Sequence, residues 1–278
     1  MVECFEMENI KKIETFCKEI RISILKMSLN AGASSSHFGG GLSIVEIVAV
    51  LFSEYLNIKK DSNSSNKNKF VLSKGHGVLP YYAALFHKGY INEDQLINFE
   101  KSNSILFGHP VRNVKHGIDY STGSLGMGVG LAVGLSLASK IKKIGTKVYC
   151  IIGDGECNEG SVWEASMSAS HHNLDNLTLI LDNNKLQQTG SNKDISNSQN
   201  LSDKWKSFGF EVIEIDGHNL YEIINALDFN NKNKPKLILA KTIKGKGFSF
   251  SENNNDWHHK VLTKSVYDQA IEELKNDI

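Results

Sequence analysis

Hydrophobic and polar positions follow two alternating kinds of pattern along most of the chain. Apolar residues recur at helical spacing between Ile10 and Met27, which predicts an amphipathic first helix that Gly32 can end. Short continuous apolar runs predict buried strands at 70–72, 148–152, 177–181, 210–215 and 236–241. Helical segments are expected between or after them at 162–171, 221–227 and 262–276. This alternation predicts an α/β fold, a doubly wound parallel sheet with helices on both faces.

Several stretches interrupt the regular pattern. Residues 59–69 are rich in Asn, Ser and Lys and lack periodicity, so they predict a flexible surface loop, and 191–200 predicts another polar loop. Ser43 and Glu46 match a capping box that would open the second helix. The run STGSLGMGVG at 121–130 opens a long helix of small residues. Its glycines permit close packing against another backbone or against a flat ligand ring.

Composition and charge narrow the class of protein. The 278 residues are 22% charged and 40% hydrophobic, with a formal net charge of zero, which is ordinary for a globular protein. We expect a single domain over 1–278, with a helical N-terminal segment at 1–32. A stripe of Lys and Arg with interleaved aromatic residues would suggest nucleic-acid binding, and the sequence contains no such stripe. The charged N-terminus is unlike a signal peptide, no apolar run reaches membrane-spanning length, and the four cysteines lack CxxC spacing, so a reduced, cytoplasmic setting is expected.

Hard oxygen donors follow two successive predicted strands. Asp154 comes after the second strand and Asn184 after the third, and one crossover can bring them to a shared edge of the sheet. A carboxylate and an amide oxygen suit Mg²⁺ or Ca²⁺ better than zinc or copper. Gly153 and Gly155 allow a phosphate to approach the backbone, and the next helix presents amide donors to an anion. The alternative is a strand-to-helix turn that carries its glycines for steric reasons alone.

Three histidines stand in short loops that contain glycine. His37 lies in SSSHFGGG, His76 in SKGHG and His109 in FGHP. A histidine in such a loop is usually a surface residue. Three such loops in one chain exceed what structural histidines alone predict, so we interpret them as candidates for binding or proton transfer.

In their order along the chain, these motifs resemble the N-terminal, thiamine diphosphate-binding half of transketolases, and closely the N-terminal subunit of split transketolases. The matching motifs are His37 with its glycine run, SKGH ending at His76, GHP at His109, STGSLGMG, the GDG–NEG–DNNK pattern at 153–185, KTIKGKG and WH at His258. The resemblance covers nearly the whole chain and implies the thiamine diphosphate-binding fold.

The resemblance implies a role for each matching residue. Asp154, Asn184 and the Leu186 carbonyl would hold Mg²⁺, with Ca²⁺ or Mn²⁺ as substitutes. The residues implied around the cofactor are His76, Gly123, Ser124, Leu125, Gly153, Asp154, Gly155, Glu156, Asn184 and Leu186. His37, His76, His109 and His258 would line the channel over the thiazolium ring; we expect His37 and His258 to transfer protons and the other two to hold hydroxyls. Glu159 would belong to a network that links paired active sites, although a helix N-terminal carboxylate favoured by the dipole explains it equally well.

The implied activity is transfer of a two-carbon ketol unit from a ketose or ketose phosphate to an aldose. In full-length transketolases a pyrimidine-binding domain and a C-terminal domain follow, and this sequence ends at Ile278. We therefore expect the chain to act only with a separate C-terminal subunit, in an α2β2 assembly. Phe38 departs from the Gly-His-Pro or Gly-His-Ile that is common in the family, which leaves substrate size open.

Other functions stay open from the sequence. Within enzymes, the alternatives are 1-deoxyxylulose-5-phosphate synthase, a 2-oxo acid dehydrogenase α subunit, and a specialised transketolase that makes an unusual sugar. A non-catalytic regulatory or partner-binding subunit could keep the same fold. A nucleotide-binding Rossmann domain ranks lowest, because GxGxxG does not follow the first strand.

Overall fold

The computed structural model describes residues 2–56, 68–196 and 200–276, with side chains described from residue 7 onward. The chain divides into two compact units. The first unit takes in 1–54, 76–121 and 243–278, and the second takes in 55–75 and 122–242. Most of the loop predicted at 59–69 falls outside the described residues, and Lys69 already begins a strand. The expectation of one domain over the whole chain stays a prediction.

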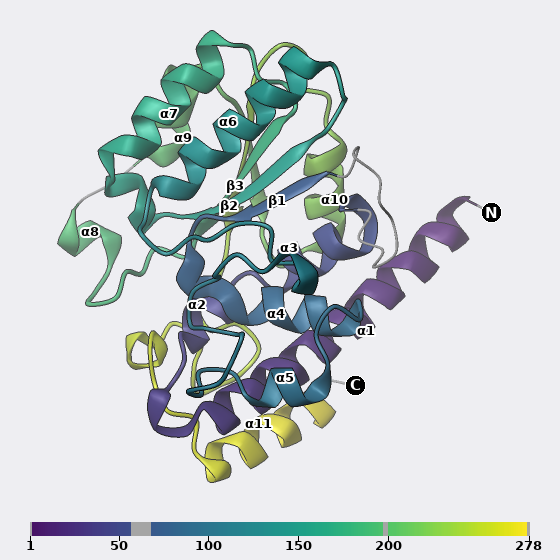
Figure 1. Cartoon of the computed structure of the whole chain (residues 1–278), viewed down its shortest axis with the longest axis vertical. Helices are drawn as coiled ribbons and strands as arrows, with labels where there is room; N and C mark the ends of the chain where they lie inside the picture. Colours follow the sequence, from purple (N-terminus) through teal and green to yellow (C-terminus); the bar gives the residue numbers. More distant parts are fainter. Residues whose placement is uncertain (1, 57–67, 197–199, 277–278) are drawn as a thin grey trace. The chain divides into compact units, whose positions relative to one another are not determined.

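The second unit is built on a parallel sheet that, within the described residues, has five strands in the order β1-β2-β3-β5-β4 (Figure 1). The strands are β1 (Lys69–Leu72), β2 (Val148–Gly153), β3 (Leu177–Asn183), β4 (Glu211–Asp216) and β5 (Lys236–Lys241). Each neighbouring pair is parallel. The apolar runs in β2 and β3 are buried because both faces of a parallel sheet are covered. The predicted α/β fold with a parallel sheet is confirmed.

The second unit also contains helices, some of which pack on the sheet. They are α6 (Met127–Lys142), α7 (Gly160–His171), the short α8 (Asn192–Ile195), α9 (Leu201–Ser207) and α10 (Leu220–Asp228), with a 3-10 turn at Gly155–Asn158. α6 packs on β1, β2 and β3 and lies beside α7, while α9 and α10 pack on β4 (Figure 1). A Cβ at Gly128 of α6 would stand 2.5 Å from the Ser73 hydroxyl and 2.6 Å from its Cα. Small residues thus let this helix approach the end of β1.

The first unit is helical. Its elements are α1 (Val2–Ala31), α2 (Phe38–Leu42), α3 (Val45–Val50), which continues into a π-helical turn at Leu51–Tyr55, α4 (Val78–His87), α5 (Glu93–Ile97) and α11 (Lys264–Asn276). Short 3-10 turns lie at Gly32–Ser34, Gly75–Gly77, Val114–His116 and Asn255–Trp257. α1 packs against α3, α4, α5 and α11, and its apolar face is buried as its spacing predicts. It ends before Gly32, which has a φ of +56°.

Three local predictions were wrong in detail. Ser43 does not form the N-cap of α3, because its hydroxyl donates to the Gly40 carbonyl (3.1 Å) and α3 begins at Val45, after Ile44. The glycine run folds into α2 directly before it and uses Ser43 as its C-cap. The small-residue helix starts at Met127 rather than within 121–126. The polar loop at 191–200 contains α8, which Ser191 caps.

Candidate functional site

The carboxyl ends of β2 and β3 bring the predicted oxygen donors to one edge of the sheet. Strand register pairs Gly153 with Asp182, and the Asp154 amide donates to the Asp182 carbonyl at 3.2 Å. Asn184 follows one residue after β3. The Lys185 amide donates to Oδ2 of Asp154 at 2.6 Å, so the two strand ends are joined where both donors lie. The expected convergence of Asp154 and the Asn184 segment is present in the structure.

Asp154 is a buried carboxylate held by backbone amides. Its side chain accepts hydrogen bonds from the amides of Gly155 (2.8 Å, Oδ1) and Lys185 (2.6 Å, Oδ2). Burial, followed by the negative charge of Asp182, raises the pKa of Asp154 to about 6, and the two amides oppose the rise. A carboxylate in such surroundings is stabilised by a nearby cation.

The amide of Asn184 is oriented by a buried ion pair. Asp182 is fully buried and pairs with Lys74, which is 1% exposed, while the Thr242 hydroxyl donates to the same carboxylate. Asn184 donates from Nδ2 to Oδ2 of Asp182 at 2.9 Å. The oxygen of the same amide, Oδ1 of Asn184, consequently points away from the Asp182 carboxylate. Lys74, Asp182 and Thr242 were not predicted from the sequence. The signal for the first two was a charged residue at or just after the end of an apolar strand.

Leu186 turns its backbone toward Asn184. It forms an isolated antiparallel bridge with Ser191. The flanking backbone bonds are Gln187 N to Gly190 O (2.9 Å) and Asn192 N to Lys185 O (3.0 Å). In this pattern the N–H and C=O of the bridged residue point away from its partner. The Leu186 amide indeed donates to Oδ1 of Asn184 at 3.1 Å. The carbonyl of Leu186 points to the same side of the strand as this amide, which is the side where Oδ1 of Asn184 lies.

Glu156 ties the glycine-rich segment at 121–126 to the sheet. The carboxylate, 1% exposed, accepts hydrogen bonds from the Ser73 hydroxyl, the Gly126 amide (2.7 Å) and the Gly153 amide (3.1 Å). Gly126 has a φ of +84°, which glycine adopts without strain. Since protein donors take up the carboxylate, the structure gives Glu156 a positioning role, and direct contact with a cofactor stays a prediction.

The remaining cofactor candidates lie at the same strand ends. A Cβ at Gly75 would stand 3.0 Å from the Gly123 amide nitrogen, so the segment with Gly123, Ser124 and Leu125 runs against the end of β1. Gly123 and Leu125 are partly exposed and Ser124 is exposed. Gly153 and Gly155 flank Asp154. The structure thus gathers these candidates around one edge.

Glu159 stands apart from this hydrogen-bond network. It is the exposed N-cap residue of α7, and its side chain makes no capping bond. Its side chain lies against Gly126, whose added Cβ would come within 2.9 Å of the Glu159 Cβ. The predicted link between paired sites is untested and stays a prediction.

The four predicted histidines converge in the first unit. His37 lies at the centre of this histidine cluster, with ring centroids 5.4 Å from His109, 5.5 Å from His258 and 5.6 Å from His76. All four side chains are partly exposed. Burial lowers the pKa of His109; the charge of Glu100 opposes this shift, and His259 adds to it. His109 is therefore neutral at pH 7 and can both donate and accept a hydrogen bond.

Segments far apart in the sequence form the histidine cluster. His37 is the N-cap residue of α2, His76 lies in the turn at Gly75–Gly77, and His258 follows the turn at Asn255–Trp257. An antiparallel bridge between Ser36 and Lys260 holds the first and last of these segments together. A fifth histidine, His259, also contacts His37, with a centroid distance of 4.4 Å. No role was predicted for His259 from the sequence, although it stands next to His258.

Phe38 is a core residue of this unit. Its side chain is fully buried, and its ring packs on Phe248 (6.0 Å between centroids), Phe250 (6.2 Å) and Trp257 (5.4 Å). It therefore packs α2 against the segment that carries His258. The departure from the family pattern at this position has a structural explanation that involves no substrate contact.

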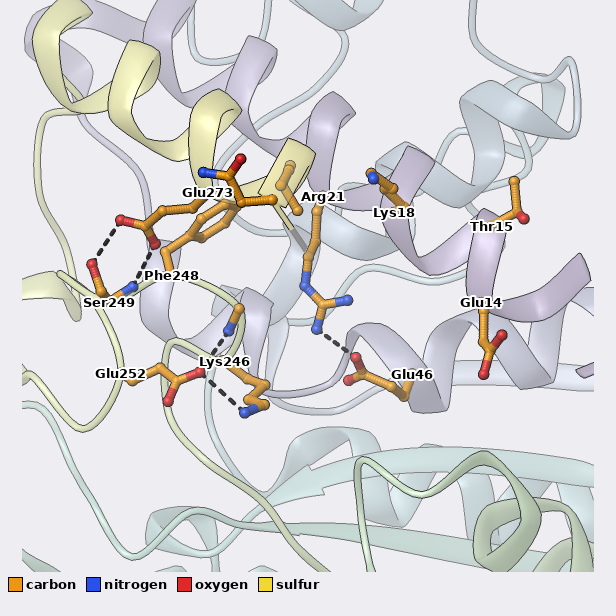
Figure 2. Close-up of a pocket in the computed structure, with 13 residues that line it drawn as sticks. Glu14, Thr15, Lys18, Arg21, Glu46, Lys246, Phe248, Ser249, Glu252 and Glu273 are labelled. Atoms are coloured by element: carbon orange, nitrogen blue, oxygen red, sulfur yellow. Dashed lines mark hydrogen bonds and ion pairs between the residues drawn. The ribbon is translucent and has the colours of Figure 1, made fainter. Parts of the chain in front are cut away.

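A cavity of about 1170 Å³ also lies in the first unit (Figure 2). It is bordered by α1, α11 and the 246–252 segment, and none of its lining residues is a predicted site residue. Four of its charged groups form two ion pairs, Arg21 with Glu46 and Lys246 with Glu252, and the other charged groups that line it are Glu14, Lys18 and Glu273. This internal pairing leaves little net charge to attract an ionic ligand.

A parallel sheet with oxygen donors and glycine turns at its carboxyl edge is typical of α/β enzymes that bind a phosphorylated cofactor. The family model described as "Transketolase, thiamine diphosphate binding domain" matches residues 14–277. The chain belongs to the transketolase family, whose members are transferases.

Relatives of two lengths match the chain. It is 41% identical to an apulose-4-phosphate transketolase subunit of Actinobacillus succinogenes over 268 residues, which covers 96% of this chain and 97% of the relative. It is also 41% identical to a 6-deoxy-6-sulfo-D-fructose transketolase subunit of a Clostridium species, covering 87% of this chain and 89% of the relative. The transketolase structure from Leishmania mexicana superposes with a TM-score of 0.87 at 29% identity, covering 95% of this chain but 41% of that one. The chain thus matches most or nearly all of the length of two transketolase subunits and about two-fifths of the Leishmania transketolase.

The residues at the sheet edge fit a divalent cation bound beside a diphosphate. Asp154 supplies a carboxylate in need of positive charge, Asn184 an amide oxygen turned away from Asp182, and Leu186 a carbonyl on the same side. Such a set of hard oxygen donors suits Mg²⁺. Among the described residues, no group of three or more His, Cys, Asp or Glu side chains is placed to hold a metal ion, and the predicted set contains a single residue of these types. No helix in the described part of the chain is both long and apolar enough to cross a membrane.

Proposed function

We propose that this chain is the cofactor-binding subunit of a two-subunit transketolase that transfers a two-carbon ketol unit from a ketose or ketose phosphate to an aldose. The observation that carries the proposal is the convergence of Asp154, Asn184 and the Leu186 backbone at adjacent strand ends, in a chain of the transketolase family.

The edge of the second unit is proposed to hold the diphosphate and its metal ion. Asp154, Asn184 and the Leu186 carbonyl would ligate Mg²⁺, and Ca²⁺ or Mn²⁺ could replace it. The backbone at Gly153 is open, because a Cβ there would find nothing closer than 3.8 Å. At Gly155 the space is tighter, because a Cβ there would meet the Gln187 side chain at 3.2 Å. Gly123, Ser124 and Leu125 are proposed to contact the organic part of the cofactor.

The histidine cluster is proposed to act on the substrate. Thiamine diphosphate, when bound, supplies the carbon centre that breaks and forms the carbon–carbon bond. His37 and His258 would accept and return protons at substrate hydroxyl groups, since an imidazole with a pKa near 6.5 can do either at neutral pH. His76 and His109 would hold hydroxyls by hydrogen bonds, and His76 is also proposed to contact the cofactor. Glu159 is proposed to take part in a link between paired sites.

A separate C-terminal subunit is the proposed partner, in an α2β2 assembly in the cytoplasm. Support comes from the two relatives that this chain covers over most of their length, because their names designate them as subunits of transketolases. The partner would supply the pyrimidine pocket of the cofactor site.

A specialised substrate is the second candidate. The same two relatives are named for apulose-4-phosphate and 6-deoxy-6-sulfo-D-fructose. We therefore propose that donor screens include apulose-4-phosphate and 6-deoxy-6-sulfo-D-fructose beside ordinary ketose phosphates. A non-catalytic subunit that keeps the fold is the alternative from another class.

The experiment is calorimetric titration of thiamine diphosphate with Mg²⁺ into the complex of this chain with its partner subunit. We expect binding that Asp154→Ala lowers at least 100-fold, since the variant removes a charged metal ligand. Asp175→Ala is the matched control, because this exposed carboxylate lies before β3, at the opposite edge of the sheet. A folded complex that binds no cofactor would refute the transketolase proposal and favour the non-catalytic one. Binding without ketol transfer to any sugar tested would also favour it.

A further inference from the structure

His259 makes the shortest ring contact in the histidine cluster. Its ring centroid lies 4.4 Å from that of His37 at an interplanar angle of 52°, whereas the other three rings lie 5.4–5.6 Å from His37. The His259 side chain is exposed, in contrast to the partly buried side chains of the cluster. It therefore joins the cluster from an exposed position and contacts the His37 ring directly.

Ser35 holds the His259 ring in this position. Its hydroxyl oxygen lies 3.0 Å from Nδ1 and 3.1 Å from Nε2 of His259. The same hydroxyl donates its proton to the Ser34 carbonyl at 2.7 Å, so toward the imidazole it can act as acceptor. An oxygen nearly equidistant from both nitrogens lies along neither N–H direction, so the hydroxyl contacts the ring by packing, whichever nitrogen carries the proton. The contact thus fixes the place of the ring without requiring one tautomer.

The backbone around both residues is built to maintain the contact. Ser36 and Lys260 exchange two backbone hydrogen bonds, Ser36 N to Lys260 O at 3.3 Å and Lys260 N to Ser36 O at 3.1 Å. These bonds place residues 35–37 and 258–260 side by side. Ser35 has a φ of +56°, a conformation that is strained for a non-glycine residue and persists where neighbouring structure enforces it. Here the strained residue is the one that carries the hydroxyl facing His259.

We propose that His259 is a positioning residue of the ketol-transfer site: held by Ser35, its ring packs against His37 and fixes the orientation of that imidazole toward the substrate. This inference rests on the proposed function, in which His37 transfers protons. The role requires the shape of the ring at position 259 and no proton of its own. A flat ring without nitrogen can therefore replace it.

Three variants in the complex with the partner subunit test this role. His259→Ala removes the ring and frees His37, so kcat should fall roughly 10- to 100-fold, the cost of a misplaced catalytic group. His259→Phe restores a ring that packs on His37 and should return kcat to within about threefold of wild type. Lys260→Ala is the control, because its side chain contacts Asp256 and Trp257, away from His37. The affinity for thiamine diphosphate should stay unchanged in all three.

A second measurement does not depend on turnover. With histidine Cε1 labelled by ¹³C, the His37 resonance of the complex, assigned by its loss in His37→Asn, should move in His259→Ala and return toward its wild-type position in His259→Phe. An unmoved His37 resonance together with unchanged kcat in His259→Ala would overturn the inference. Equal losses of kcat in the Ala and Phe variants would also overturn it, because His259 would then act through its own nitrogens. If the wild-type complex transfers no ketol unit, the proposed function fails, and the resonance alone decides whether His259 orients His37.

Discussion

Replacing Lys74 by Met tests the buried network behind the proposed metal site. Lys74 and Asp182 are 1% and 0% exposed, so the substitution leaves the Asp182 carboxylate in the protein interior without its cation. Removing one partner of a buried ion pair costs about 3–5 kcal/mol, mostly as the desolvation of the charge left behind. The Thr242 hydroxyl and the Asn184 amide also donate to Asp182, and because both are neutral they offset only part of that cost. We expect the free energy of unfolding to fall by about 3 kcal/mol or more.

The double variant Lys74→Met/Asp182→Asn separates charge from shape. It removes both charges and keeps an oxygen that can accept from Asn184, so we expect at least half of the lost stability to return. Lys12→Met is the surface control: Lys12 and Glu8 are each 67% exposed and 2.9 Å apart, a pair worth at most about 1 kcal/mol. Urea unfolding of the three variants, monitored by circular dichroism, gives the differences. A loss below about 1 kcal/mol in Lys74→Met, equal to the surface control, would show that Asp182 does not depend on Lys74.

Two further predictions concern stability. Gly128→Ala places a Cβ 2.5 Å from Ser73 and should lower the free energy of unfolding by about 1–3 kcal/mol. Gly130→Ala on the same helix meets no atom within 4 Å and should raise the free energy of unfolding by up to about 1 kcal/mol. Equal effects of the two variants in thermal unfolding would contradict the packing of α6 on Ser73. Burial lowers the pKa of Lys236 to about 8, so between pH 8 and 10.5 the unfolded state binds more protons than the folded one and stability due to this residue should increase with pH. Near pH 9 the slope should approach about 1.4 kcal/mol per pH unit, measured as the difference between wild type and Lys236→Met, and a difference independent of pH would refute it.

The fold could be predicted from the sequence because its elements carry local signals. Each apolar run became a strand within a residue or two, as the run at 148–152 did in β2 (Val148–Gly153). The crossover length between Asp154 and Asn184 then sufficed to place both donors at one edge. The boundaries that failed are those where tertiary contacts compete with local rules. Ser43 is an example, because the glycine run before it forms α2 and takes its hydroxyl.

The histidine cluster could not be derived from local patterns. The rings of His37 and His258 lie 5.5 Å apart, although more than 200 positions separate them in the chain. What joins them is the Ser36–Lys260 bridge and the packing of Phe38 on Trp257, and neither has a signature in the sequence. The resemblance to transketolases predicted four of the histidines. His259 was outside that pattern, and only the structure brings it into contact with His37.

Three buried carboxylates meet at the edge of the sheet in the second unit, and their surroundings indicate which one would bind a cation. Asp182 has the ammonium group of Lys74 and two neutral donors. Glu156 has one hydroxyl and two amides, all fixed by the backbone at the ends of β1 and β2 and by the segment at 121–126. Asp154 accepts from two amides, and its pKa is nevertheless raised to about 6, since burial and the nearby Asp182 outweigh them. A divalent cation beside Asp154 would offset both terms, whereas beside Asp182 it would compete with Lys74. This difference in compensation supports Asp154 as the charged metal ligand, with Asp182 acting through the orientation of Asn184.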